Sequence, residues 1–221
     1  MDNPTTESNN HNKNRPGNGS KTGIFTKGRK KSLIQWTVLI AGAAILYLTG
    51  LHTEVIGTMQ RGLLATGIIQ PDIPDLEGDF PEAGRDLFFM DEEGSVQSLH
   101  DYEGEVIFIN IWATWCPPCI AEMPSIQGLY NRFDQEDNVA FLLISVDEKF
   151  DTAREFMENR NLEMPVYHYR NRAPGIFEST VIPTTYVVSP DGLLLMEKRG
   201  FAKYDTDAFE SFLKEASTRF N

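Results

Sequence analysis

Two cysteines lie close together in the segment Trp112–Cys119, W-A-T-W-C-P-P-C, and the 221-residue chain has no others. A C-x-x-C pair that follows a strand and opens a helix is typical of a redox-active dithiol, because one helical turn brings the two sulfur atoms within bonding distance. The positive end of the helix dipole stabilises a thiolate, which is the attacking species in thiol–disulfide exchange. We therefore predict that Cys116 is the nucleophile and that Cys119 resolves the mixed disulfide.

Other uses of the cysteine pair fit the sequence less well. A zinc site would need two further ligands, and the chain has no other cysteine and no histidines at ligand spacing. A c-type haem attachment requires a histidine directly after the second cysteine, where Ile120 stands. A purely structural disulfide over so short a loop would restrict the unfolded chain little. We therefore expect no metal and no cofactor beyond the cysteine pair itself.

The elements that must position this pair alternate along the chain. Val106–Trp112 and Val139–Val146 are almost entirely apolar, which predicts two buried central strands. Further strands are expected at 86–90, 96–99, 166–169, 184–188 and 193–198, and helices at 117–133, 152–160 and 206–220. Alternating strands and helices followed by a hairpin predict a three-layer α/β/α fold with a mixed sheet.

The N-terminal part of the chain has a different composition. Residues 1–32 are polar and basic, which predicts a disordered tail, and residues 33–51 form an uncharged apolar run long enough to span a bilayer. A cleaved signal peptide is the alternative, but its apolar region is usually shorter and ends in a small-residue site. Basic residues before the run place the tail in the cytoplasm. Residues 52–75 are a stalk or amphipathic linker, and 76–221 the soluble domain.

Charge follows this division. Residues 1–31 carry seven basic and two acidic side chains, whereas the rest of the chain carries 13 basic and 30 acidic ones. Nucleic-acid binding needs clustered Lys and Arg on the folded domain, so the acidic excess argues against it. The sequence therefore predicts a single-pass membrane protein, held in the lipid by residues 33–51, with an acidic domain outside the cytoplasm.

Three motifs together resemble a known family. The segment Trp112–Cys119, then Glu122–Pro124, then Val181–Thr185 occur in the order found in the membrane-anchored, thioredoxin-fold thiol–disulfide oxidoreductases of the TlpA/ResA kind. The resemblance covers roughly residues 76–221. It implies a thioredoxin-like fold in which the bond between Ile182 and Pro183 is cis and Pro183 lies beside the active-site disulfide. It also implies a membrane thiol reductant of the DsbD/CcdA type as electron source and apocytochrome c as one substrate.

Glu122 is expected to move the proton of Cys119. It lies three residues after Cys119, so the two side chains share a helix face, and a partly buried carboxyl group has a raised pKa. In thioredoxins an Asp six residues before the first cysteine has this role, and Asn110 stands at that position here. Asn110 cannot titrate, so the role is assigned to Glu122, as the resemblance also implies. The alternative is a solvated surface carboxylate.

The remaining expectations concern substrates and direction. Trp115 and Ile182 are expected to provide apolar surface for docking of exported thiol or disulfide proteins. Pro117 and Pro118 remove backbone N–H donors near Cys116, which predicts a comparatively reducing pair. Two other functions stay open: a thiol peroxidase on the same fold, and a redox-sensing or metallochaperone module.

Overall fold

The computed structural model describes residues 34–42, 44, 62–64, 66–133, 138–170 and 175–220. The chain divides into two compact units, Met1–Leu48 and Thr49–Asn221. In the first unit, residues 34–42 and 44 are helical. Within the described ranges no helix is both long and apolar enough to cross a membrane. The predicted tail 1–32, about half of the predicted anchor 33–51 and all of residues 52–61 lie outside these ranges.

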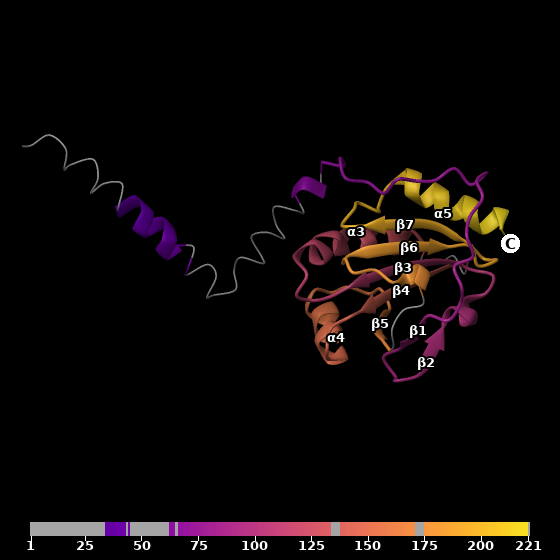
Figure 1. Cartoon of the computed structure of the whole chain (residues 1–221), viewed down its shortest axis with the longest axis horizontal. Coiled ribbons are helices and arrows are strands. Elements are labelled where there is room, and N and C mark those ends of the chain that lie inside the picture. Colours follow the sequence, from indigo (N-terminus) through magenta and orange to yellow (C-terminus); the bar gives the residue numbers. More distant parts are fainter. Residues whose placement is uncertain are drawn as a thin grey trace, which may run out of the picture. The chain divides into compact units, whose positions relative to one another are not determined.

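The second unit is built on one seven-stranded sheet with the order β2-β1-β5-β4-β3-β6-β7, in which order the labels run upwards in Figure 1. The elements follow the chain as β1 (Phe88–Met90), β2 (Val96–Ser98), η1 (Leu99–Tyr102), β3 (Val106–Trp112), α3 (Pro117–Phe133), β4 (Val139–Ser145), α4 (Phe150–Asn159), β5 (Val166–Tyr169), η2 (Gly175–Phe177), β6 (Thr184–Val188), β7 (Leu194–Arg199) and α5 (Asp207–Arg219). Strands β3, β4 and β5 pair in parallel, and the other pairings are antiparallel. The predicted mixed sheet is confirmed.

The two central strands are buried along their whole length. Every residue of β3 and of β4 is buried, which is why both read as continuous apolar runs. Parallel pairing runs from Val106 opposite Val139 to Trp112 opposite Ser145, so both strands end at the same edge of the sheet. The chain leaves β3 at this edge and enters α3 after four connecting residues, with Pro117 at the first helical position, where a missing N–H costs nothing. This connection carries Cys116.

Helices α3, α4 and α5 of the second unit all contribute to the first of two apolar clusters. Met123 and Ile126 of α3, Met157 of α4 and Phe209 of α5 belong to the first cluster, together with Trp112 and Phe108 of β3. Thr206 caps the N-terminus of α5, and its side chain accepts a hydrogen bond from the N–H of Phe209. This cluster anchors α3 on the sheet and so fixes the direction in which its first turn points.

The opposite sheet face is covered differently from the expectation. Its cluster takes Leu87 and Leu99 from the region around β1 and η1 and Phe177 from the short helix η2, with no α-helix among the described residues. The predicted layer of helices is therefore present on the face covered by α3, α4 and α5. For the other face the predicted helical layer is wrong, because the described residues that pack there belong to strands, extended segments and 3₁₀ helices. The segment between β5 and β6 contains Pro174, Gly175 and Pro183, residue types that disfavour a helix, and among its described residues the short helix η2 forms.

Packing onto the domain extends to residues before 76. Ile69 packs against the first cluster, and its carbonyl oxygen accepts a hydrogen bond of 2.9 Å from the N–H of Lys203. Leu76 is part of that cluster. The segment from about residue 69 onward therefore belongs physically to the folded domain.

Candidate active site

The two cysteines form a disulfide at the start of α3. Cys116 lies directly before the helix and Cys119 on its first turn, with Cα atoms 5.3 Å apart. The backbone N–H of Cys119 donates to Cys116 Sγ at 3.2 Å, and the N–H of Cys116 donates to the carbonyl oxygen of Ala113. Only 4% of Cys116 is exposed and Cys119 is fully buried. Of the two cysteines, Cys116 is therefore the one that solvent reaches, over a small area.

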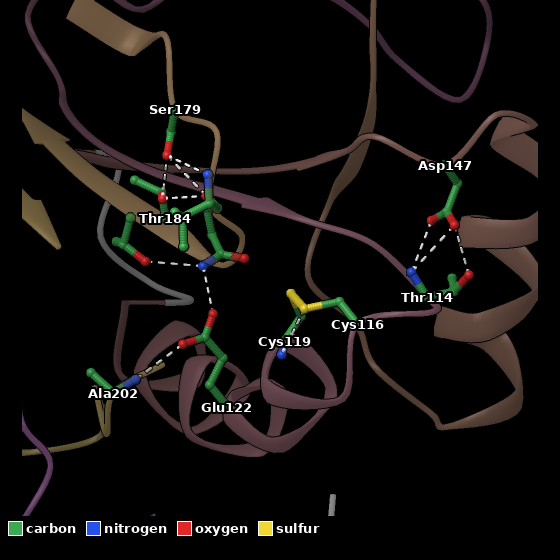
Figure 2. Close-up of a disulfide and its surroundings, with 11 residues drawn as sticks. Thr114, Cys116, Cys119, Glu122, Asp147, Ser179, Thr184 and Ala202 are labelled. Carbon is green, nitrogen blue, oxygen red and sulfur yellow. Dashed lines mark hydrogen bonds between the residues drawn. A yellow bond between two sulfur atoms is a disulfide. The ribbon is translucent and has the colours of Figure 1, made fainter. Parts of the chain in front are cut away.

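Glu122 is a fully buried carboxyl group one helical turn after Cys119. Its Oε1 accepts a hydrogen bond of 2.8 Å from the side-chain amide of Asn110 on β3, and its Oε2 accepts one of 3.2 Å from the backbone N–H of Ala202. Figure 2 shows Glu122 on the helix that carries Cys119, with its carboxyl group directed to the backbone N–H of Ala202. A carboxyl group held in this way next to the cysteine pair can store or accept a proton.

Burial controls the protonation of this group. Loss of solvation raises the pKa of Glu122 from its ordinary value of 4.5 to about 8, and the hydrogen bonds from Asn110 and Ala202 oppose the rise by stabilising the carboxylate. Glu122 is therefore mostly protonated at neutral pH while the cysteines are oxidised. A pKa near neutrality is what a group needs in order both to take up and to release a proton.

A second buried carboxylate fixes the loop that carries Cys116. Asp147 follows β4 at the same edge of the sheet and is only 4% exposed. It accepts hydrogen bonds from the backbone N–H of Thr114 at 3.0 Å and from the Thr114 hydroxyl at 2.7 Å (Figure 2). It also accepts one from the Ser145 hydroxyl at 2.8 Å. Since Thr114 lies two residues before Cys116, these bonds restrain the approach to the nucleophile.

A groove of about 360 Å³ lies beside the disulfide loop. Trp115 and Ile182 both line it, together with Ile111 and Phe177 from the opposite cluster. Trp115 is 63% exposed, an unusual position for so large an apolar side chain. The two residues predicted to dock substrates therefore border one largely apolar hollow next to Cys116.

Pro183 lies at the entry to β6 and is buried, and the bond between Ile182 and Pro183 is cis. The following hydroxyl, Thr184 Oγ1, donates to the carbonyl oxygen of Val181 at 2.7 Å, which closes the loop on itself. Ser179 Oγ lies 2.9 Å from Thr184 Oγ1 (Figure 2). These bonds hold the segment that carries Ile182 against the strand.

The partners of Glu122 and the role of Asp147 were missed from the sequence. Asn110 gave one usable signal, since it is the only polar residue in the otherwise apolar strand Val106–Trp112. Asp147 gave another, since it follows a parallel strand next to the one that precedes Cys116. Ala202 donates through its backbone, and no side-chain pattern could have predicted that contact. Within the described ranges, no cluster of three or more His, Cys, Asp or Glu residues could hold a metal ion.

Comparison with known proteins identifies the family to which the domain belongs. A family model described as the AhpC/TSA family matches residues 70–195. The chain belongs to this family. The thiol-disulfide oxidoreductase ResA of Oceanobacillus iheyensis is 32% identical over 131 residues, which cover 59% of this chain and 66% of that protein. ResA of Bacillus thuringiensis is 29% identical over 129 residues, covering 57% of this chain and 71% of the relative.

Solved structures show the same fold. A putative thiol:disulfide interchange protein DsbE from Chlorobium tepidum superposes with a TM-score of 0.55 at 22% identity, covering 63% of this chain and 98% of that one. A putative thiol-disulfide oxidoreductase from Bacteroides vulgatus gives a TM-score of 0.51 at 25% identity, covering 61% and 94%. The predicted thioredoxin-like α/β fold and the likeness to ResA are confirmed. Together with the Cys116–Cys119 disulfide, these relatives indicate a thiol–disulfide oxidoreductase.

Proposed function

We propose that the protein exchanges the Cys116–Cys119 dithiol and disulfide with exported protein substrates, acting as a reductant. The observation that carries this proposal is the pairing of the only two cysteines in a disulfide at the start of α3, with a buried carboxyl group one turn further along. The arrangement supplies a nucleophile, a resolving thiol and a proton acceptor in one short segment.

The reaction needs two exchanges. The Cys116 thiolate attacks one sulfur of a substrate disulfide, which forms a mixed disulfide and releases the other substrate sulfur as a thiolate. The Cys119 thiolate then attacks Cys116 Sγ, which breaks the mixed disulfide and releases the second substrate thiolate. The substrate gains two electrons, and the protein is left in its oxidised form with the Cys116–Cys119 disulfide.

Glu122 has the role of proton acceptor in the second exchange. Cys119 is fully buried, so its thiol cannot lose a proton directly to bulk water. Glu122 is buried on the same helix face, and the pKa of about 8 that burial gives it is close to the ordinary pKa of a thiol. Proton transfer between groups of similar pKa is efficient. The hydrogen bonds from Asn110 and Ala202 stabilise Glu122 as a carboxylate, the form that accepts the proton.

The residues around Cys116 favour reduction of substrates. Pro117 and Pro118 have no N–H, and the N–H of Cys119 is the donor that reaches Cys116 Sγ. Strongly oxidising pairs owe their potential to a well-stabilised thiolate in the reduced form. With two of the first donors removed, the thiolate of Cys116 is stabilised less, and the dithiol gives up its electrons more readily.

The groove beside Trp115 is the proposed docking site for substrate. An extended segment with an apolar side chain next to its cysteine would bury that side chain against Ile182 and Phe177. The exposed indole of Trp115 would close over the mixed disulfide.

The proposed location is the bacterial inner membrane, with residues 33–51 as anchor and the domain outside the cytoplasm. The uncharged run and the basic residues before it support this orientation. Because exported compartments are oxidising, a reductant there needs electrons from the membrane, for which a protein of the DsbD/CcdA type is proposed. Apocytochrome c is the proposed candidate substrate. Protease added to intact spheroplasts should digest the domain, and protection of the domain would reverse the orientation.

Activity can be tested with insulin disulfides and dithiothreitol as electron source. The wild-type protein should accelerate reduction, and the Cys116→Ala variant should lose this activity. A protein that leaves insulin reduction unchanged but consumes peroxide would instead be a thiol peroxidase.

A further inference from the structure

Asn110 has an unusual place in the sheet for a side-chain amide. It is fully buried in the middle of β3, opposite Thr185 of β6 in the antiparallel register. Its amide nitrogen donates to Glu122 Oε1 at 2.8 Å and to Thr185 Oγ1 at 3.0 Å, which uses both N–H groups. Its carbonyl oxygen is buried and has no hydrogen-bond partner among the described residues. Both N–H donors of this amide thus have hydrogen-bond partners, whereas its acceptor oxygen has none among the described residues.

The chain of contacts continues behind Thr185. The hydroxyl group of Tyr204 donates to Thr185 Oγ1 at 2.7 Å, and both residues are fully buried. Thr185 therefore receives the Asn110 amide from one side and Tyr204 from the other. Three segments that are far apart in the sequence, β3, β6 and the stretch before α5, meet in this way behind Glu122.

The direction of the Asn110 amide matters for the neighbouring carboxyl group. With N–H towards Oε1, the amide stabilises a carboxylate, whereas its carbonyl oxygen in the same place would repel a carboxylate and accept a proton-bearing oxygen instead. Burial raises the pKa of Glu122 and so opposes its ionisation, whereas the hydrogen bonds from the N–H groups of Asn110 and Ala202 lower that pKa.

We propose that Asn110 is a positioning residue, which holds the buried Glu122 carboxyl group towards its N–H donors and keeps that group able to ionise. Asn110 touches neither substrate nor sulfur in this role, and it acts through Glu122. The inference deepens the proposed function, since it rests on Glu122 accepting the proton of Cys119. It also gives Asn110 a function although its side chain does not titrate.

Few groups other than Asn110 can influence Glu122. On α3 the nearest titratable side chain is Cys119, which is held in the disulfide when the protein is oxidised. From the segment before α5, Tyr204 faces the site, and burial raises its pKa well above the ordinary value, so it is neutral. From β3 and β6 the facing side chains are Asn110 and Thr185, which carry no charge. The ionisation of Glu122 in the oxidised protein therefore depends on its burial and its hydrogen bonds, and not on a neighbouring charge.

The test measures Glu122 directly in the oxidised full-length protein, by ¹³C NMR of its side-chain carboxyl carbon across a pH titration. In Asn110→Ala the pKa of Glu122 should rise by roughly one to two pH units, the size expected for loss of a hydrogen bond to a charged group. At a fixed pH below the pKa, this reduces the ionised fraction about 10- to 100-fold. In Thr185→Val a smaller rise is expected, because the amide loses the contact that orients it.

Thr184→Val is the matched control. Thr184 is as buried as Thr185 and is its neighbour on β6, but its hydroxyl group bonds Val181 and Ser179 instead of Asn110. This variant should leave the pKa of Glu122 in place. An unchanged or lowered pKa in Asn110→Ala would overturn the proposal. If that variant does not fold, Thr185→Val decides alone, and a shift no larger than in the control would overturn it.

A second readout separates this proposal from the proposed role of Glu122. The pH dependence of Cys119 alkylation is measured for Asn110→Ala in the wild-type background and in Glu122→Gln. Asn110 acting through Glu122 predicts a shifted profile in the first background and no further shift in the second. An equal shift in both backgrounds would show a structural effect and contradict the proposal. A moved Glu122 pKa with an unmoved alkylation profile would leave Asn110 in its role and refute the proton relay.

Discussion

Replacement of Glu122 by Gln should change how the stability of the folded domain depends on pH. Below pH 4.5 the folded and the unfolded chain both hold the proton of Glu122. As the pH rises from 4.5 to about 8, the unfolded chain releases this proton while the folded chain retains it, because burial raises the pKa of the folded group to about 8. The wild-type protein therefore loses stability across this window, and the loss is complete above pH 8.

The size of the effect follows from the shift. One pKa unit corresponds to about 1.4 kcal/mol, so a rise from 4.5 to about 8 amounts to about 5 kcal/mol over the window and about 3 kcal/mol between pH 5 and pH 7. Rearrangement or water entry on ionisation would lower these values, which makes them upper values. The Gln side chain lacks this titration, but its N–H₂ group must face the donor of Ala202 or Asn110, a cost that is the same at every pH.

Urea unfolding of the oxidised proteins at several pH values measures the difference. The free energy of unfolding of Glu122→Gln, relative to wild type, should rise by up to about 3 kcal/mol between pH 5 and pH 7. Contributions of other titrating groups are common to both proteins and cancel. Glu215→Gln makes the same chemical change on the exposed side of α5 and should give a curve parallel to that of wild type. Parallel curves for Glu122→Gln as well would refute the inference that the buried carboxyl group is protonated at neutral pH.

Three further predictions concern the neighbourhood of the disulfide. Asp147→Ala leaves the N–H and hydroxyl of Thr114 and the hydroxyl of Ser145 without their acceptor. Three charge-assisted hydrogen bonds are lost, partly offset by removal of a buried charge, so the free energy of unfolding measured in urea should fall by about 3 kcal/mol. A loss below about 1 kcal/mol would contradict this. Trp115→Ala removes an exposed side chain, so the free energy of unfolding should change by less than about 0.5 kcal/mol. The KM for protein disulfides should rise, while the rate with a small aromatic disulfide stays the same. Equal losses with both substrates would argue against docking of protein substrates on Trp115. Titration of Cys116 in Cys119→Ala should give a thiol pKa above about 5, and a lower value would contradict a reducing pair.

Much of the fold followed from local sequence patterns. Val106–Trp112, Pro117–Phe133 and Val166–Tyr169 have the bounds that periodicity predicted, because apolar strands and a helix that begins with proline leave strong local signals. The layer over the second sheet face could not be predicted in the same way. It depends on extended segments and short 3₁₀ helices around Leu87 and Phe177, whose packing is set by the tertiary structure and not by any period.

The active site likewise has features that could be predicted from local sequence and features that could not. The spacing of Cys116, Cys119 and Glu122 at the start of one helix could be read from the sequence, since neighbours on a helix face are three or four residues apart. The contacts of Glu122 and Thr114 were not readable, because they join residues 12 to 80 positions apart. Asn110 and Thr185 meet through the register of β3 on β6, and a single-residue slip would separate them. Such contacts become visible only once the strand order is known.

The measurement that tests the central claim most directly is capture of substrate on the first cysteine. In cells that express Cys119→Ala, the mixed disulfide cannot be resolved, so exported proteins should accumulate in adducts with this variant that dithiothreitol releases. The reverse variant Cys116→Ala, which keeps Cys119, should capture few or no such adducts. Equal capture by Cys116→Ala, or a Cys119→Ala variant that captures nothing, would contradict the assignment of Cys116 as the nucleophile of a thiol–disulfide exchange.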